Sequence, residues 1–205
     1  MAEFIAFEGI DGSGKSTQAR ALHRRLLHRA HPVLLVHEPG GTPLGESLRR
    51  WVKQRQGLFP LTELYLFNAA RAQLVEQVIR PALEQGVTVV ADRFSASTVA
   101  YQSYGRGLDL ELVLQVNQGA TGGLSPDLTV FLDVPPEIGR GRKRLGNKDN
   151  FDAAPLEFYQ RVRQGYLDQA QSQVSGKGPD WLMLDGSRPK TQLSDEIWEI
   201  VQPLL

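Results

Sequence analysis

Five short runs of apolar residues alternate along this chain with longer amphipathic segments. The runs are EFIAFEG, PVLLVHEP, VTVVADR, LTVFLDV and WLMLDG, at residues 3–9, 32–39, 87–93, 128–134 and 181–186. Uninterrupted apolar runs of this length are typical of strands that are buried on both faces of a parallel sheet. Their alternation with helix-like segments therefore predicts an α/β fold.

The amphipathic segments between these runs have the length and pattern of helices. They cover residues 17–29, 61–86, 109–120, 155–174 and 190–205. No stretch has the composition of an interdomain linker, and a chain of 205 residues is long enough to bury one core of its own. We therefore expect a single domain over residues 1–205.

Charge and composition limit the kinds of partner that this chain is expected to have. Lys plus Arg and Asp plus Glu both number 23, so the total charge indicates neither a nucleic-acid partner nor a membrane partner. The chain has no cysteine, which excludes disulfides, thiolate metal sites and cysteine nucleophiles. No apolar stretch approaches the ~20 residues of a membrane span, and Glu3 stands where a signal peptide would be basic. We expect a cytoplasmic protein.

A glycine-rich loop follows the first apolar run and precedes a helix-like segment. Residues 9–16 fit the pattern Gly-x4-Gly-Lys-Ser, and their glycines let backbone N–H groups turn toward a phosphate. In this interpretation Lys15 neutralises the terminal phosphates and Ser16 binds Mg²⁺. The predicted nucleotide-binding residues of the loop are Gly9, Asp11, Gly12, Ser13, Gly14, Lys15, Ser16 and Thr17. The alternative is an ordinary glycine-rich turn that is capped by a hydroxyl.

The residues that follow the other runs matter because ligands of open α/β sheets bind outside the carboxyl ends of the strands. The third run ends in Asp92, where a carboxylate is expected to complete a magnesium site, and Arg93 follows it. An arginine can hold a phosphate through two hydrogen bonds, so the pair suits a metal ion together with a second phosphate. Asp92 could otherwise be a turn or cap residue.

Several of these motifs together resemble one known family. The strings FEGIDGSGKSTQ, EPGGTPLGE, LFNAARAQ, DRFSASTVAYQ and PDLTVFLDV occur in the order found in thymidylate kinases, and the similarity covers essentially the whole chain. The resemblance implies a P-loop kinase fold with a five-stranded parallel sheet flanked by helices and a short lid. It also implies transfer of the γ-phosphate of ATP to dTMP with Mg²⁺, giving dTDP for dTTP synthesis and DNA replication, by a homodimer. The long helix expected from Leu61 to Glu84 is a candidate dimer contact.

The resemblance assigns an acceptor site to residues of several segments of the chain. Phe67 and Arg71 are four residues apart and share a helix face, and by resemblance Phe67 stacks on thymine while Arg71 donates to its O4. Thr98 is expected at the base edge, and Tyr101 beneath the sugar, where its ring would exclude a 2′-hydroxyl. The other acceptor-site candidates are Asp11, Glu38, Arg49, Arg93, Ser97 and Gln102. The alternatives are core packing for Phe67, and helix capping or surface hydrogen bonds for the polar side chains.

One residue departs from the family pattern directly before the string EPGGTPLGE. Many members have Arg where this chain has His37, directly before Glu38. We therefore treat His37 as a structural residue.

Basic residues gather in the segment IGRGRKRLGNKDNFD, where the resemblance places a lid at about residues 140–153. Because the phosphate loop contains no arginine, the resemblance implies that the lid supplies the arginine that acts on the transferred phosphoryl group. The candidates are Arg142 and Arg144, with Arg140 and Arg188 as further contacts of ATP. A solvated basic patch is the alternative.

Two other functions compete with this interpretation. A different nucleoside or nucleotide kinase of the same fold would need another acceptor pocket than the set around Phe67. A GTP-dependent switch would carry Asn-Lys-x-Asp, and the nearest string, Asn147-Lys148-Asp149-Asn150, has the wrong spacing. Phosphoryl transfer needs no protein nucleophile, so Lys15, Arg93, Mg²⁺ and a lid arginine would carry the reaction by positioning and charge neutralisation.

Overall fold

The computed structural model describes residues 2–54, 57–143, 154–173 and 180–205. The strands are β1 (Phe4–Glu8), β2 (Val33–His37), β3 (Thr88–Asp92), β4 (Leu128–Asp133) and β5 (Asp180–Asp185). The α-helices are α1 (Lys15–His28), α2 (Pro43–Gln54), α3 (Pro60–Leu74), α4 (Arg80–Glu84), α5 (Ser95–Thr98), α6 (Leu110–Thr121), α7 (Pro136–Lys143), α8 (Leu156–Gln173) and α9 (Lys190–Val201). Two π-helical stretches, η1 (Val75–Ile79) and η2 (Val99–Gly105), and a 3-10 turn, η3 (Gln202–Leu204), complete the elements.

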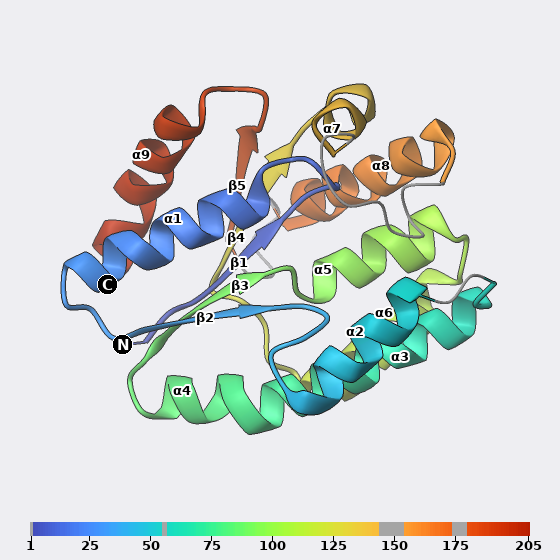
Figure 1. The fold of residues 1–205 in the computed structure, drawn as a ribbon, viewed down its shortest axis with the longest axis horizontal. Helices are drawn as coiled ribbons and strands as arrows, with labels where there is room; N and C mark the ends of the chain where they lie inside the picture. The colour runs from blue at the N-terminus through green and yellow to red at the C-terminus, as the bar shows by residue number, and fades with distance from the viewer. Residues whose placement is uncertain (1, 55–56, 144–153, 174–179) are drawn as a thin grey trace.

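The five strands form one parallel sheet in the order β2-β3-β1-β4-β5, which confirms the predicted fold class. Helices α1 and α9 lie on one side of the sheet, and α3, α4 and α8 lie on the other (Figure 1). Alternate residues of β1 face the two layers: Ile5 and Phe7 join the core under α1 and α9, while Phe4 and Ala6 join the core under α3 and η1. No helix of the described part of the chain is both long and apolar enough to cross a membrane.

The two outer strands correct the expectation that every strand is buried on both faces. In β2 only Val36 is buried, and in β5 Met183 is exposed. The reason is position, because β2 and β5 are the edges of the sheet and the central strands β1, β3 and β4 separate them. The apolar runs predicted the strands correctly, whereas the depth of each strand follows from its order in the sheet.

The helix predicted over residues 61–86 is interrupted by a π-helical stretch. Helix α3 passes into η1 and then into α4, and the N–H of Arg80 donates to the carbonyl of Val75. Pro81 has no N–H to donate to the preceding turn, so the regular ladder cannot continue unchanged through this point. A second π-helical stretch, η2, continues α5, and there the N–H of Arg106 donates to the carbonyl of Tyr101. The second stretch carries Tyr101 and Gln102, which line a cavity.

Candidate functional site

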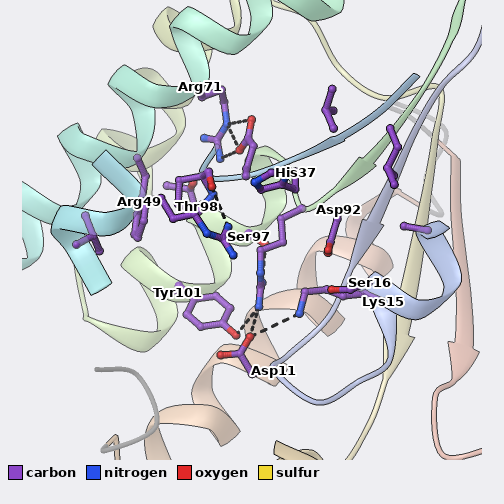
Figure 2. Close-up of a pocket in the computed structure, with 18 of the residues that line it drawn as sticks. Asp11, Lys15, Ser16, His37, Arg49, Arg71, Asp92, Ser97, Thr98 and Tyr101 are labelled. Carbon is purple, nitrogen blue, oxygen red and sulfur yellow. Dashed lines mark hydrogen bonds and ion pairs between the residues drawn. The ribbon is translucent and has the colours of Figure 1, made fainter. Parts of the chain in front are cut away.

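A cavity of about 550 Å³ opens at the carboxyl ends of β1, β2 and β3, between the glycine-rich loop and helices α2 and α3 (Figure 2). It brings together the predicted acceptor-site residues Asp11, Glu38, Arg49, Phe67, Arg71, Arg93, Ser97, Thr98, Tyr101 and Gln102. Lys15, Ser16 and Asp92, which the sequence assigns to the nucleotide phosphates and Mg²⁺, line the same cavity. Arg71 and Asp11 lie at opposite ends of the group of side chains in Figure 2. The parallel sheet explains this gathering, since its strands all end at one edge.

The glycine-rich loop has the backbone geometry that its sequence predicts. Gly9, Gly12 and Gly14 all have positive φ angles, and α1 begins directly after Gly14 at Lys15. A Cβ atom at position 12 would lie 2.1 Å from the carbonyl oxygen of Gly139 in α7. Only glycine therefore allows α7 to pack this close to the loop.

Lys15, the first residue of α1, lines this cavity. Its side chain is buried, its Nζ donates to the carbonyl of Ile10 at 3.3 Å, and the Asp11 carboxylate is 3.6 Å away. Burial and the nearby charge of Arg93 lower the pKa of Lys15 to about 8. A negative charge such as a phosphate would therefore stabilise the protonated form of Lys15.

Arg93 is held in a conformation that non-glycine residues rarely adopt, with φ at 77°. One terminal nitrogen donates to the Gly9 carbonyl at 3.3 Å, the Ser97 hydroxyl at 2.9 Å and the Tyr166 hydroxyl at 3.2 Å. The other donates to the Asp11 carboxylate and to the Tyr101 hydroxyl. Burial opposes the charge of Arg93, but Tyr101 and Asp11 outweigh it and raise the pKa well above its ordinary value.

A buried network behind Arg93 was not predicted from the sequence. Glu8, the last residue of β1, is fully buried and accepts from the N–H groups of Phe94 and Ser97, from the Ser97 hydroxyl at 2.6 Å and from the Tyr166 hydroxyl at 2.9 Å. The Ser97 hydroxyl, which is predicted to contact substrate, donates to Glu8 and accepts from Arg93. A glutamate inside an apolar run was the available signal, because a fully buried carboxylate needs partners.

Arg71 is buried, and each of its three side-chain nitrogens donates to a protein acceptor. The guanidinium forms a two-point pair with Glu38, and its terminal nitrogens also reach Asn68, Asn117 and the Phe94 carbonyl. The structure therefore places Arg71 at the cavity wall but with its donors occupied. A bond to thymine O4, as the resemblance implies, would have to share or replace one of these contacts.

Gln102 is hydrogen-bonded to Glu63, a residue that was not predicted from the sequence. Its Nε2 donates to Glu63 of α3 at 2.7 Å, and Arg106 donates to the same carboxylate at 3.2 and 3.1 Å. Both Glu63 and Gln102 are buried. The spacing of Glu63 from Phe67, four residues along α3, was the signal that could have found it.

His37 and Arg49 brace the loop that follows β2. His37 Nε2 lies 2.9 Å from Glu46, whose carboxylate also accepts from the N–H of Gly41. Arg49 donates to the Pro39 carbonyl at 2.9 Å. These contacts agree with a structural part for His37, although its side chain also lines the cavity.

Asp92 and Ser16 line the same cavity and offer oxygen atoms to a cation. Asp92 Oδ1 is buried and has no hydrogen-bond partner among the described residues. The described ranges contain no cluster of three or more His, Asp or Glu side chains able to hold a metal by themselves. A single carboxylate with a hydroxyl suits Mg²⁺, which usually binds few protein ligands together with substrate phosphates.

A second cavity of about 560 Å³ lies on the other side of the glycine-rich loop. It is lined by Gly12, Ser13, Gly14, Lys15, Ser16, Thr17, Gln18, Arg142, Gly186, Arg188, Lys190 and Leu193. Arg142 donates to the carbonyls of Gly186 at 2.8 Å and Ser187 at 3.3 Å, and so joins α7 to the loop after β5. Arg188 lines this cavity and pairs with Glu196 at 2.6 Å.

The structure separates the predicted lid arginines. Arg142 reaches the second cavity, whereas Arg140 is exposed and is not among the described residues that line either cavity. Arg144 and most of the predicted lid, about residues 140–153, lie outside the described residues.

Comparisons with known proteins relate the chain to one family. The sequence model of the family described as thymidylate kinase matches residues 7–197. The chain is 46% identical over 200 residues to the thymidylate kinase of Deinococcus radiodurans, covering 97% of this chain and 95% of that one. It is 44% identical over 221 residues to that of Roseiflexus castenholzii, covering 100% and 95%. The crystal structure of thymidylate kinase from Ehrlichia chaffeensis superimposes with a TM-score of 0.79 at 35% identity, covering 98% of each chain.

Proposed function

The chain belongs to the thymidylate kinase family, and from that premise we propose that it transfers the γ-phosphate of ATP to dTMP, giving dTDP and ADP. One observation carries the proposal for the site. Lys15 and Ser16 line both cavities, so the glycine-rich loop separates a donor cavity from an acceptor cavity. Phosphoryl transfer needs this arrangement, because the donor and acceptor phosphates must meet in line.

In the acceptor cavity, Arg93 binds the phosphate of dTMP and Phe67 stacks on the base. Arg93 is held at the carboxyl end of β3 by contacts on both sides, and therefore loses little freedom when a phosphate replaces part of its pairing with Asp11. Tyr101 lies against Arg93, with the guanidinium carbon 4.9 Å from the ring centroid, and forms the floor on which the sugar rests. Thr98, Glu38 and Arg49 complete the cavity wall.

In the donor cavity, the glycine-rich loop binds the phosphates of ATP, and Lys15 supplies the charge that bridges to the acceptor. Ser16 and Asp92 would hold Mg²⁺, which when bound neutralises charge that develops on the phosphates. Arg142 and Arg188 close the cavity from α7 and from the loop after β5. We assign the phosphoryl-directed arginine of the lid to Arg142 or Arg144, which makes the chain a member of the lid-arginine subclass.

The proposal extends to the assembly and to the setting. Helix α3 packs against α6, and together they expose Leu61, Tyr65, Leu110 and Leu114. Apolar side chains gathered in this way favour a protein partner, and a second copy of the chain is the partner that we propose. The product dTDP would feed dTTP synthesis, and the cytoplasmic location stays a prediction of the sequence.

A substrate panel tests the reaction. ADP release is measured with ATP and Mg²⁺ against dTMP, dUMP, UMP and dCMP, and thymidine serves as the control that lacks an acceptor phosphate. We expect dTMP to have the highest kcat/KM and dUMP to follow it, because one methyl group is worth only about 1–3 kcal/mol in an apolar pocket. Faster turnover of thymidine or of a ribonucleotide would contradict the proposed acceptor site.

A further inference from the structure

Glu63 is a buried carboxylate that lies outside the proposed reaction but touches its acceptor cavity through Gln102. It is 3% exposed and receives hydrogen bonds from Gln102 and Arg106. Resting on the function proposed above, we propose that Glu63 is a positioning residue for base selectivity. It fixes the Gln102 amide so that the carbonyl oxygen faces the acceptor base, and thereby selects bases that carry a hydrogen at N3.

The orientation of the Gln102 amide follows from the chemistry of its partner. A glutamine amide has a donor end and an acceptor end of nearly equal shape, and only its partners decide which end points where. The Glu63 carboxylate accepts hydrogen bonds and cannot donate them, so the Nε2 end of Gln102 must face it, at 2.7 Å. Because the amide is planar, Oε1 is directed away from Glu63.

Arg106 keeps this arrangement in place. Its guanidinium spans both oxygens of Glu63, which supplies the opposite charge that a buried carboxylate requires. Arg106 in turn lies over the ring of Phe158, with its guanidinium carbon 5.0 Å from the ring centroid. The amide of Gln102 is therefore oriented by a carboxylate that is itself fixed by α8.

The position of Glu63 along α3 places the Glu63–Gln102 pair beside the base. Glu63, Phe67 and Arg71 follow one another at intervals of four residues and share one helix face. Phe67, Arg71 and Gln102 all line the acceptor cavity. With the base stacked on Phe67, Arg71 lies one helical turn further along α3. Glu63, which holds Gln102, lies one turn before Phe67.

This placement distinguishes the pyrimidines by their hydrogen-bonding edges. Thymine and uracil present N3–H, a donor, which a fixed carbonyl oxygen accepts. Cytosine presents N3 as an acceptor, which would face another acceptor and leave both groups unpaired. A site that is built around a fixed hydrogen bond rejects an analogue with the wrong group far better than an apolar pocket rejects a missing methyl.

The test measures kcat/KM for dTMP, dUMP and dCMP in the wild-type protein and in Glu63→Gln. The replacement keeps the shape of the side chain but can donate as well as accept, so the Gln102 amide is free to rotate. We expect the dTMP-to-dCMP ratio to fall at least about tenfold, because one mismatched buried hydrogen bond is relieved. The ratio of kcat/KM for dTMP to that for dUMP should stay unchanged, because both bases carry N3–H. General damage to the site would change this second ratio as well.

Two further variants isolate the path through Gln102. In Gln102→Leu the dTMP-to-dCMP ratio should fall to a similar extent, and adding Glu63→Gln to it should change the ratio no further. Glu76→Gln is the matched control, since Glu76 also pairs with an arginine, Arg80, but lies on an exposed surface. That variant should keep the wild-type ratio.

Several results would overturn the proposal. A dTMP-to-dCMP ratio in folded Glu63→Gln that stays within about twofold of wild type would do so, as would equal effects of Glu63→Gln with and without Gln102. If circular dichroism shows that Glu63→Gln is unfolded, Glu63→Asp takes its place, because it keeps the charge but withdraws from Gln102. A wild-type protein without dTMP turnover would instead remove the proposed function, and this inference with it.

Discussion

At the scale of single residues, the protonation state of Lys15 bears most directly on ATP binding. Its side chain is buried beside Arg93, and these two conditions lower its pKa to about 8. Burial disfavours the charged form of Lys15 unless a negative group lies beside it. The Asp11 carboxylate, 3.6 Å from Nζ, offsets this penalty only in part. Phosphates of ATP would raise the pKa again, so binding of the nucleotide is coupled to uptake of a proton above pH 8.

We therefore predict that the affinity for Mg²⁺·ATP weakens as the pH rises through about 8. The dissociation constant should grow by up to about tenfold per pH unit above that value, because each binding event must then protonate Lys15. Titration calorimetry between pH 7 and 9.5 measures it, with Lys15→Arg as the control that stays charged throughout. A wild-type affinity that is independent of pH over this range would show that Lys15 does not titrate as described.

At the scale of elements, helix α8 supports the acceptor site from behind. Tyr166 of α8 is fully buried, and its hydroxyl contacts Glu8 at 2.9 Å, Ser97 at 2.8 Å and Arg93 at 3.2 Å. Burial and the charge of Glu8 raise the pKa of Tyr166 well above its ordinary value, so the hydroxyl stays neutral and keeps donating. Strand β1, through Glu8, and helix α8, through Tyr166, thus fix one arginine at the end of strand β3.

Removing the Tyr166 hydroxyl should take one hydrogen bond from Arg93 while the remaining ring still fills the core. In Tyr166→Phe we expect kcat/KM for dTMP to fall about tenfold, the effect of losing a buried hydrogen bond to a charged group, while KM for ATP stays as in wild type. Steady-state kinetics with each substrate varied in turn measures both. Tyr104→Phe is the control, since its hydroxyl bonds to Asp168 away from the cavity. Equal losses in the two variants would argue against a specific link from α8 to Arg93.

At the scale of the whole molecule, exposed apolar side chains are concentrated on the layer of α2, α3 and α6, which Figure 1 shows together at one end of the sheet. Leu44 and Trp51 of α2 add to those of α3 and α6. The same layer supplies Phe67 and Arg71 to the acceptor cavity from its inner face. An interface on the outer face would therefore brace the helix that carries the base pocket.

Disrupting this layer should change the oligomeric state. We predict that the wild-type protein sediments as a dimer at micromolar concentration, and that Leu114→Glu sediments as a monomer, because a buried unpaired charge opposes association. Leu27→Glu places the same charge on an equally exposed leucine of α1, on the other side of the sheet, and should leave the dimer intact. A monomeric wild type in analytical ultracentrifugation would refute the proposed assembly.

The sequence by itself determined the strands, the glycine-rich loop and the residues at the ends of the strands. These features depend on local patterns: an apolar run, a spacing of glycines, or Asp92-Arg93 directly after a strand, all of which a parallel sheet brings to one edge. Phe67 and Arg71 were equally accessible, since helical periodicity alone places them on one face.

Only the tertiary structure decided which donors meet which acceptors. Glu8 and Tyr166 are 158 residues apart in sequence, and Gln102 and Glu63 are 39 apart, so no local pattern pairs them. It also showed that the Ser97 hydroxyl and the Arg71 guanidinium are already engaged within the protein. The physical reason is that a buried polar group must find a partner wherever the chain brings one, and packing fixes that choice after the local patterns have formed the elements.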